Sequence, residues 1–193
     1  MSALLMMLWF ALQATKPGIP VEQEPQHRVV LKNGFVRVLD AKLPSGYVTL
    51  HHAHDVDSVS VTIATGRTTE APDARRVGRA TFSKGGYSHT VTNSNPEFMR
   101  FIVVEAVKSD RPGAAALQLP NHTLETENDR LRIYRVKLAP GESLPSHTHS
   151  SGWVEVLVGG PNTGDAQWHA GGSSSLPVVA GNQPLEVVEV EPK

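Results

Sequence analysis

Five of the nine histidines in this chain lie in two tight clusters, and imidazole both binds metals and transfers protons near neutral pH. One cluster is His51, His52 and His54, and the other is His147 and His149. Side chains two residues apart on a β-strand point to the same face. Each His-x-His pair can therefore bind one metal ion together with a further ligand from another strand.

The third ligand for the first cluster must come from elsewhere in the chain, and His89 is the candidate. His51 alternates with His52, so we expect it to face outward. The pattern assigns no role to the scattered histidines, which are His27, His122 and His169.

Composition limits both the chemistry and the partners. The 193 residues include no cysteine, which excludes disulfides, thiolate metal sites and cysteine nucleophiles. A metal here is held by imidazole, with or without oxygen ligands. Lysine and arginine number 18 against 19 acidic residues, and the resulting net charge of −1 gives no electrostatic footprint for nucleic acid. We therefore expect no nucleic-acid partner.

The chain contains an internal repeat. Residues 33–46 lie over residues 128–141 at an offset of 95, and the two His-x-His pairs match at the same offset. After a shorter loop in the second copy the offset becomes 86, and residues 98–105 lie over residues 184–191. The predicted first unit, linker and second unit are residues 27–106, 107–120 and 121–191.

Both copies have the pattern of short β-strands. Glycine and proline together make up 30 of the 193 residues and place turns between short runs rich in β-branched residues. Sustained helical periodicity is missing after the N-terminal run, so we predict an all-β fold with a sandwich or barrel in each half. The expected strands include residues 36–39, 59–63, 101–104, 131–136 and 154–158.

The chain begins with an apolar run over residues 3–12, which at ten residues is too short to span a bilayer. Polar, proline-rich sequence follows it. We predict a secretory signal peptide over residues 1–14, a mature chain starting near Thr15, and a periplasmic or secreted location without membrane attachment after cleavage. The alternatives are an uncleaved N-terminal anchor and an apolar helix that packs on the fold.

The first copy also carries glycines, histidines and an asparagine at fixed spacing: Gly46, His52, His54, Gly66, Gly78, Gly86, His89 and Asn93. These eight positions match the two motifs of the cupin superfamily, with Lys84 where proline is usual. The chain thus resembles a bicupin. This resemblance implies two tandem jelly-roll barrels, with a divalent metal (Fe, Mn, Zn, Ni or Cu) held inside the first by His52, His54 and His89.

Departures from the cupin motifs affect both copies. The usual glutamate ligand falls at Ser58 or Val59 in the first copy, with Asp57 one step away. The second copy keeps His147 and His149, which form a weaker candidate site, but Ser175 stands where the third histidine belongs. The second copy therefore resembles a degenerate, structural cupin.

Three functions remain open at this point. The first is a metalloenzyme of the oxygenase, isomerase or lyase type that acts on a small molecule inside the barrel. The second is a module that binds a small ligand or a metal without catalysis. The third is a structural bicupin without metal. A homodimer is a further expectation, and the substrate is not encoded in the fold.

Overall fold

The computed structural model describes residues 18–67, 76–119 and 121–193. The predicted signal peptide lies outside these residues. The first half contains η1 (Val21–Gln23) and eight strands: β1 (Ile19–Pro20), β2 (His27–Lys32), β3 (Val36–Leu43), β4 (His52–His54), β5 (Ser58–Thr65), β6 (Ala80–Ser83), β7 (Tyr87–His89) and β8 (Met99–Ala106).

The second half contains β9 (Thr123–Glu127), β10 (Leu131–Leu138), β11 (Ser143–Leu144), β12 (Trp153–Val158), β13 (Ala166–His169), β14 (Val178–Val179) and β15 (Leu185–Pro192). The predicted all-β class is confirmed. No helix in the described part of the chain is long and apolar enough to cross a membrane.

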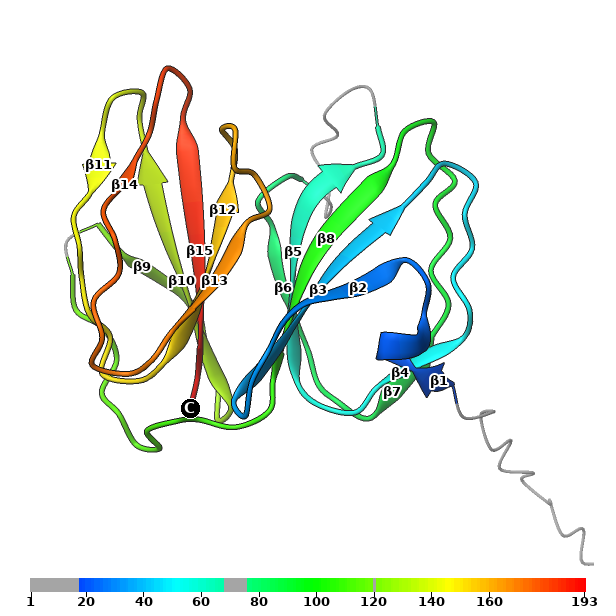
Figure 1. Cartoon of the computed structure of the whole chain (residues 1–193), viewed down its shortest axis with the longest axis horizontal. Coiled ribbons are helices and arrows are strands. Elements are labelled where there is room, and N and C mark those ends of the chain that lie inside the picture. The colour runs from blue at the N-terminus through cyan, green and yellow to red at the C-terminus, as the bar shows by residue number, and fades with distance from the viewer. Residues whose placement is uncertain (1–17, 68–75, 120) are drawn as a thin grey trace, which may run out of the picture.

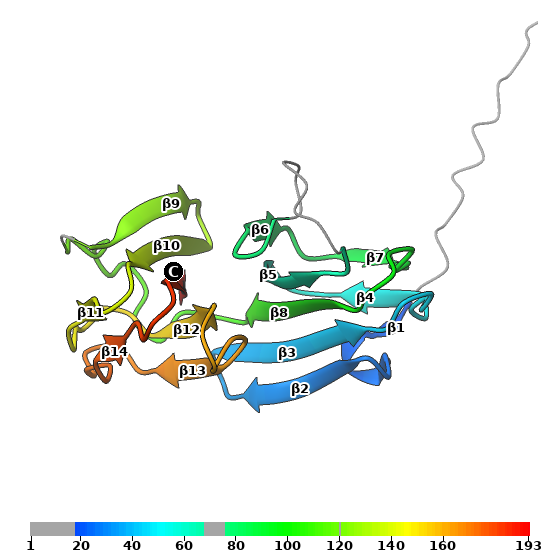
Figure 2. The ribbon, with the colours of Figure 1, turned by 90° about the horizontal axis from the view of Figure 1, so that it is seen from above.

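The sheet topology reproduces the sequence repeat. The first half forms a five-stranded sheet in the order β2-β3-β8-β5-β6, and the second forms one in the equivalent order β9-β10-β15-β12-β13. Smaller sheets, β1-β4-β7 and β11-β14, lie opposite them. The two halves stand side by side (Figure 1), and each curls so that its edge strands, β2 and β6 or β9 and β13, lie far apart (Figure 2).

The largest hydrophobic core lies between the two halves. Fifteen buried residues from both five-stranded sheets form one cluster, including Val104 on β8 and Val190 on β15. Phe35 and Trp168 stack at the margin of this cluster with ring centroids 5.6 Å apart. The two sheets therefore pack face to face, as in a β-sandwich, through the outer faces of the barrels.

Strand alternation sends the remaining side chains of these sheets into the barrels. On β8, Ile102 and Val104 belong to the core between the sheets, so Val103 and Glu105 face the interior of the first half. On β15, Val188 and Val190 belong to the core, so Glu189 faces the interior of the second half. The interiors thus receive buried polar groups that must find partners.

The connecting segment is attached to the second half through Asp110. Its carboxylate accepts hydrogen bonds from the backbone N–H of Gly152 at 2.6 Å and of Gly171 at 2.7 Å, and from the Ser151 hydroxyl at 3.2 Å. Burial raises the pKa of Asp110, but these hydrogen bonds outweigh it and hold the pKa below its usual value. The chain therefore enters the second half along a fixed path.

The sandwich core gives a matched test of stability. Val104 is fully buried, whereas Val179 is 64% exposed. We expect Val104→Ala to lower the free energy of unfolding by about 2 kcal/mol, since it removes two buried methyl groups and leaves a cavity. Val179→Ala should change it by less than about 0.5 kcal/mol. Denaturant titration measures both, and equal effects would contradict the assignment of this core.

Candidate metal centres

The first candidate centre is built by two paired strands. His52 and His54 lie on the same face of β4, and β7 pairs antiparallel with β4 so that His89 stands opposite His52. One ligand nitrogen from each of the three lies within 4.8 Å of the others. The structure therefore brings together the three histidines that the sequence singled out, although they span 38 positions of the chain. His51 is exposed, as expected.

The hydrogen bonds of this centre leave nitrogen lone pairs free. Nδ1 of His52 donates to the Leu50 carbonyl at 2.8 Å, and Nδ1 of His54 lies 3.0 Å from a carboxylate oxygen of Glu105. A ring protonated at Nδ1 presents Nε2 as a metal ligand. Nε2 of His52 and of His89 are buried and have no hydrogen-bond partner in the described part of the chain. Such orphaned atoms are costly, and a metal ion would satisfy them.

Glu105 orients the His54 ring through its contact with Nδ1. It is fully buried and also accepts a hydrogen bond from Arg37. Burial raises the pKa of Glu105, but the hydrogen bonds with His54 and Arg37 outweigh it and lower the pKa below its usual value. An ionised carboxylate behind a histidine fixes the ring and makes it a stronger ligand.

The ligands of the first centre carry no carboxylate. Burial lowers the pKa of His52 and lowers that of His89 to about 4, so both rings are neutral at pH 7. Asp57, the acid nearest the motif glutamate position, instead accepts a hydrogen bond from the Gly85 backbone N–H at 2.8 Å. Three imidazoles therefore make up this ligand set.

A cavity of about 190 Å³ lies beside this centre. His27, His54 and His89 contribute to its wall, and Tyr87 stacks on His54 with ring centroids 5.0 Å apart. No Asp, Glu, Lys or Arg is among the described residues that line it. The centre thus adjoins a small, uncharged space inside the first barrel.

The second half holds a cluster in which His122 and Glu189, which the sequence did not predict, join the weaker candidate pair His147 and His149. His122, His147, His149 and Glu189 each offer a ligand atom within 4.8 Å of the others. Burial raises the pKa of Glu189, but its hydrogen bonds with the three histidines hold it well below the usual range. Burial lowers the pKa of His147 and His149, but their contacts with Glu189 raise both above the ordinary value.

The interpretation of the second copy as a structural remnant rested on Ser175 and missed this cluster. The repeat itself held the signal. His122 lies 95 residues after His27, and Glu189 lies 86 residues after Val103, so both occupy repeat positions outside the cupin motifs. A search confined to motif positions could not find them.

In both halves, a glutamate held by an arginine contacts Nδ1 of the second histidine of the His-x-His pair. Nδ1 of His149 lies 2.9 Å from Glu191, and Arg132 donates to Glu191 at 2.5 Å. These three residues are the repeat equivalents of His54, Glu105 and Arg37. The arrangement that orients a ligand is thus present twice.

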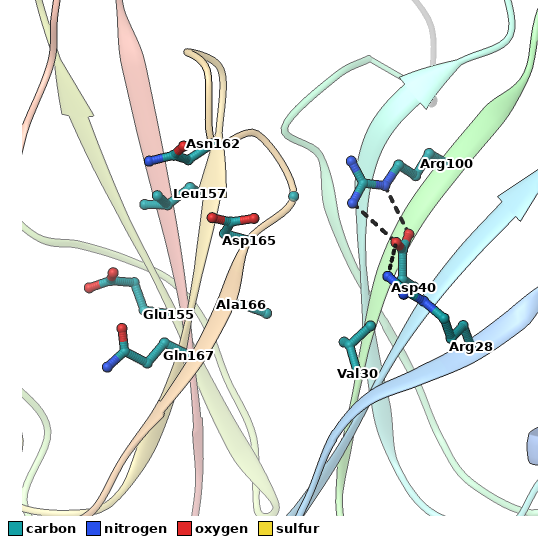
Figure 3. Close-up of a pocket in the computed structure, with 11 residues that line it drawn as sticks. Arg28, Val30, Asp40, Arg100, Glu155, Leu157, Asn162, Asp165, Ala166 and Gln167 are labelled. Atoms are coloured by element: carbon teal, nitrogen blue, oxygen red, sulfur yellow. Dashed lines mark hydrogen bonds and ion pairs between the residues drawn. The ribbon is translucent and has the colours of Figure 1, made fainter.

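A larger cleft of about 550 Å³ lies between the two halves (Figure 3). On its first-half side Arg100 donates to Asp40 at 2.8 Å and 3.1 Å, and Arg28 lies 3.6 Å from the same carboxylate. Arg100 also donates to the Thr163 carbonyl at 3.0 Å, which joins the two halves. These charges are paired with one another, so the cleft is a weaker candidate site than the barrels.

Solved structures support the fold. A salicylate 1,2-dioxygenase from Pseudaminobacter salicylatoxidans matches with a TM-score of 0.59 at 11% identity, over 89% of this chain and 77% of that one. AerE from Microcystis aeruginosa matches with a TM-score of 0.51 at 12% identity, over 88% of this chain and 98% of that one.

The chain therefore shares its all-β fold with these two solved structures, in agreement with the cupin resemblance of its motifs. No protein-family model matches its sequence, and no curated protein does.

The contact between Glu105 and His54 predicts that metal affinity falls when the carboxylate is removed. We expect Glu105→Gln to weaken metal binding in the first barrel about 10- to 100-fold, because the amide neither fixes nor polarises the ring as the carboxylate does. Competition titration with a chelator measures this. Glu97→Gln, at an exposed position, is the control and should bind as the wild type does. An unchanged affinity in Glu105→Gln would contradict the orienting role.

Proposed function

We propose that this protein binds a divalent transition metal in its N-terminal barrel and presents it to a small anionic molecule with oxygen donors. The observation that carries the proposal is the pair of buried, unpartnered Nε2 atoms of His52 and His89 beside His54. These nitrogens suit Fe, Mn, Zn, Ni or Cu. When bound, the metal would supply a Lewis acid or a site for oxygen chemistry.

Charge selects the class of ligand. Three neutral imidazoles leave the 2+ charge of the ion uncompensated, and the described lining residues add no charge of either sign. In a low-dielectric cavity this imbalance favours an anionic oxygen ligand such as a carboxylate. The volume of about 190 Å³ equals roughly six water molecules at about 30 Å³ each, so the ligand is small.

The cavity wall would orient that ligand. Ser58, Ser60 and Ser83 offer hydroxyl groups, and Phe101 offers an apolar surface. His27 is neutral at pH 7, because burial and the neighbouring histidines lower its pKa to about 3. Its buried Nδ1 has no partner among the described residues and is available to hydrogen-bond a ligand. The chain's own residues thus position the molecule and exclude water from it.

A salicylate 1,2-dioxygenase is among the solved neighbours, so O₂-dependent oxidation of a small carboxylate is the first reaction to test. The second candidate is a binding module without catalysis. It is favoured by the lining, which offers no carboxyl or amino group as a general acid or base. Oxygen uptake by metal-loaded protein with small carboxylates separates the two, since a binding module retains the ligand and consumes no oxygen.

Removal of one ligand tests the centre itself. Protein purified without a histidine tag should lose one equivalent of bound metal in His89→Ala, as measured by elemental mass spectrometry, because two imidazoles hold the ion far more weakly than three. The control is His51→Ala, which removes an exposed histidine beside the same strand and should keep the full content. Metal content in His89→Ala equal to the wild type would sink the ligand assignment.

We also propose that the protein is exported, on the evidence of the apolar run over residues 3–12. Mass spectrometry of the periplasmic or secreted fraction should find a chain that begins near Thr15. Recovery of only the full-length chain from the cytoplasm would contradict this.

A further inference from the structure

We infer that the C-terminal barrel contains a second metal site, closed and structural, with His122, His147, His149 and Glu189 as its ligands. Two of its ligands, His122 and Glu189, lie outside the cupin motifs, and the site is independent of the proposed function, which concerns the other barrel.

The ligand atoms around Glu189 lie close enough together to share one ion. One carboxylate oxygen lies 2.9 Å from Nε2 of His147, and the other lies 3.1 Å from Nε2 of His149 and 3.3 Å from Nε2 of His122. Two ligand atoms bound at right angles to one ion, each at about 2.1 Å, stand about 3 Å apart. The four side chains need little rearrangement to hold one.

The hydrogen bonds on the far side of the His147 and His149 rings leave their Nε2 atoms facing the carboxylate. Nδ1 of His147 donates to the Pro145 carbonyl at 3.2 Å, and Nδ1 of His149 lies 2.9 Å from Glu191. In the metal-free protein, a proton on Nε2 of His147 and of His149 makes the hydrogen bonds to Glu189. One divalent ion would replace these protons and take the Nε2 lone pairs and the carboxylate as its ligands.

Burial of the cluster gives the site its closed character. The side chains of His149 and Glu189 are 0% exposed and that of His122 is 1% exposed. The ring of Trp153, itself fully buried, stacks on His149 with centroids 4.1 Å apart. A metal here would exchange slowly and stabilise the fold rather than meet a substrate.

The charge of the second site also differs from that of the first. Glu189 contributes one negative charge, so a divalent ion and its ligands there would carry a net charge of +1, against +2 for an ion held by the three imidazoles of the other barrel. Val103 stands at the repeat position of Glu189 and Ser175 at that of His89. Each copy has therefore completed its His-x-His pair from a different position, and two chemically distinct centres result.

The test counts metal in the full-length, tag-free protein after removal of all metal and reloading with Zn²⁺ alone. We expect two equivalents in the wild type. One should remain in Glu189→Gln and in His122→Ala, one in His89→Ala, and none when Glu189→Gln and His89→Ala are combined. Circular dichroism verifies folding, and Glu189→Gln keeps the shape of the side chain if His122→Ala fails to fold.

Thermal unfolding supplies a readout that does not depend on activity. Zn²⁺ should raise the melting temperature of the wild type and of each single variant, but leave that of the variant that combines Glu189→Gln with His89→Ala nearly unchanged.

Two results would overturn the inference: a Glu189→Gln variant that binds as much Zn²⁺ as the wild type, or a single wild-type equivalent that His89→Ala abolishes. A single equivalent that Glu189→Gln abolishes and His89→Ala retains would instead support the second site and refute the proposed function.

Discussion

The face-to-face contact between the two five-stranded sheets is the constraint on which the rest of the molecule depends. It buries the outer face of each barrel, where Val104 and Val190 lie in one shared core. Because side chains alternate along a strand, every residue committed to that core sends its neighbour inward. Glu105 and Glu189 are such neighbours. The largest apolar cluster lies between the sheets, so the barrel interiors hold these polar groups beside smaller apolar clusters, such as the one that includes Val136 and Val187.

Buried charge in these interiors is tolerated because it is paired. In each half an arginine contacts a glutamate, which in turn contacts the second histidine of the His-x-His pair. An isolated carboxylate at such a depth would be neutralised or expelled, whereas one held between a guanidinium and an imidazole stays ionised. The same pairing fixes the ring that a metal would need. Stability and function thus draw on the same contacts.

Divergence between the two copies lies in the ligand that completes each pair. The first copy uses His89, leaves its set uncharged and adjoins a cavity. The second uses His122 and Glu189 and is sealed by Trp153. An open, positive centre suits the binding of a small anion, whereas a closed and more neutral one suits a structural ion. A repeated fold can in this way separate reactivity from stability within one chain.

Much of this arrangement follows from the sequence alone. The turn residues and the short β-branched runs predicted β3, β5, β8, β10 and β12, and motif spacing selected His52, His54 and His89. Strand patterns and motif spacings are local or periodic signals, so the sequence alone shows them. Tertiary structure decided the rest. His122 and Glu189 are 67 positions apart, and only the curl of the second half brings them together. Nor could alternation alone show that Val104 faces the other sheet, because both faces of β8 carry apolar residues and only the packing of the second half determines which of them is the core.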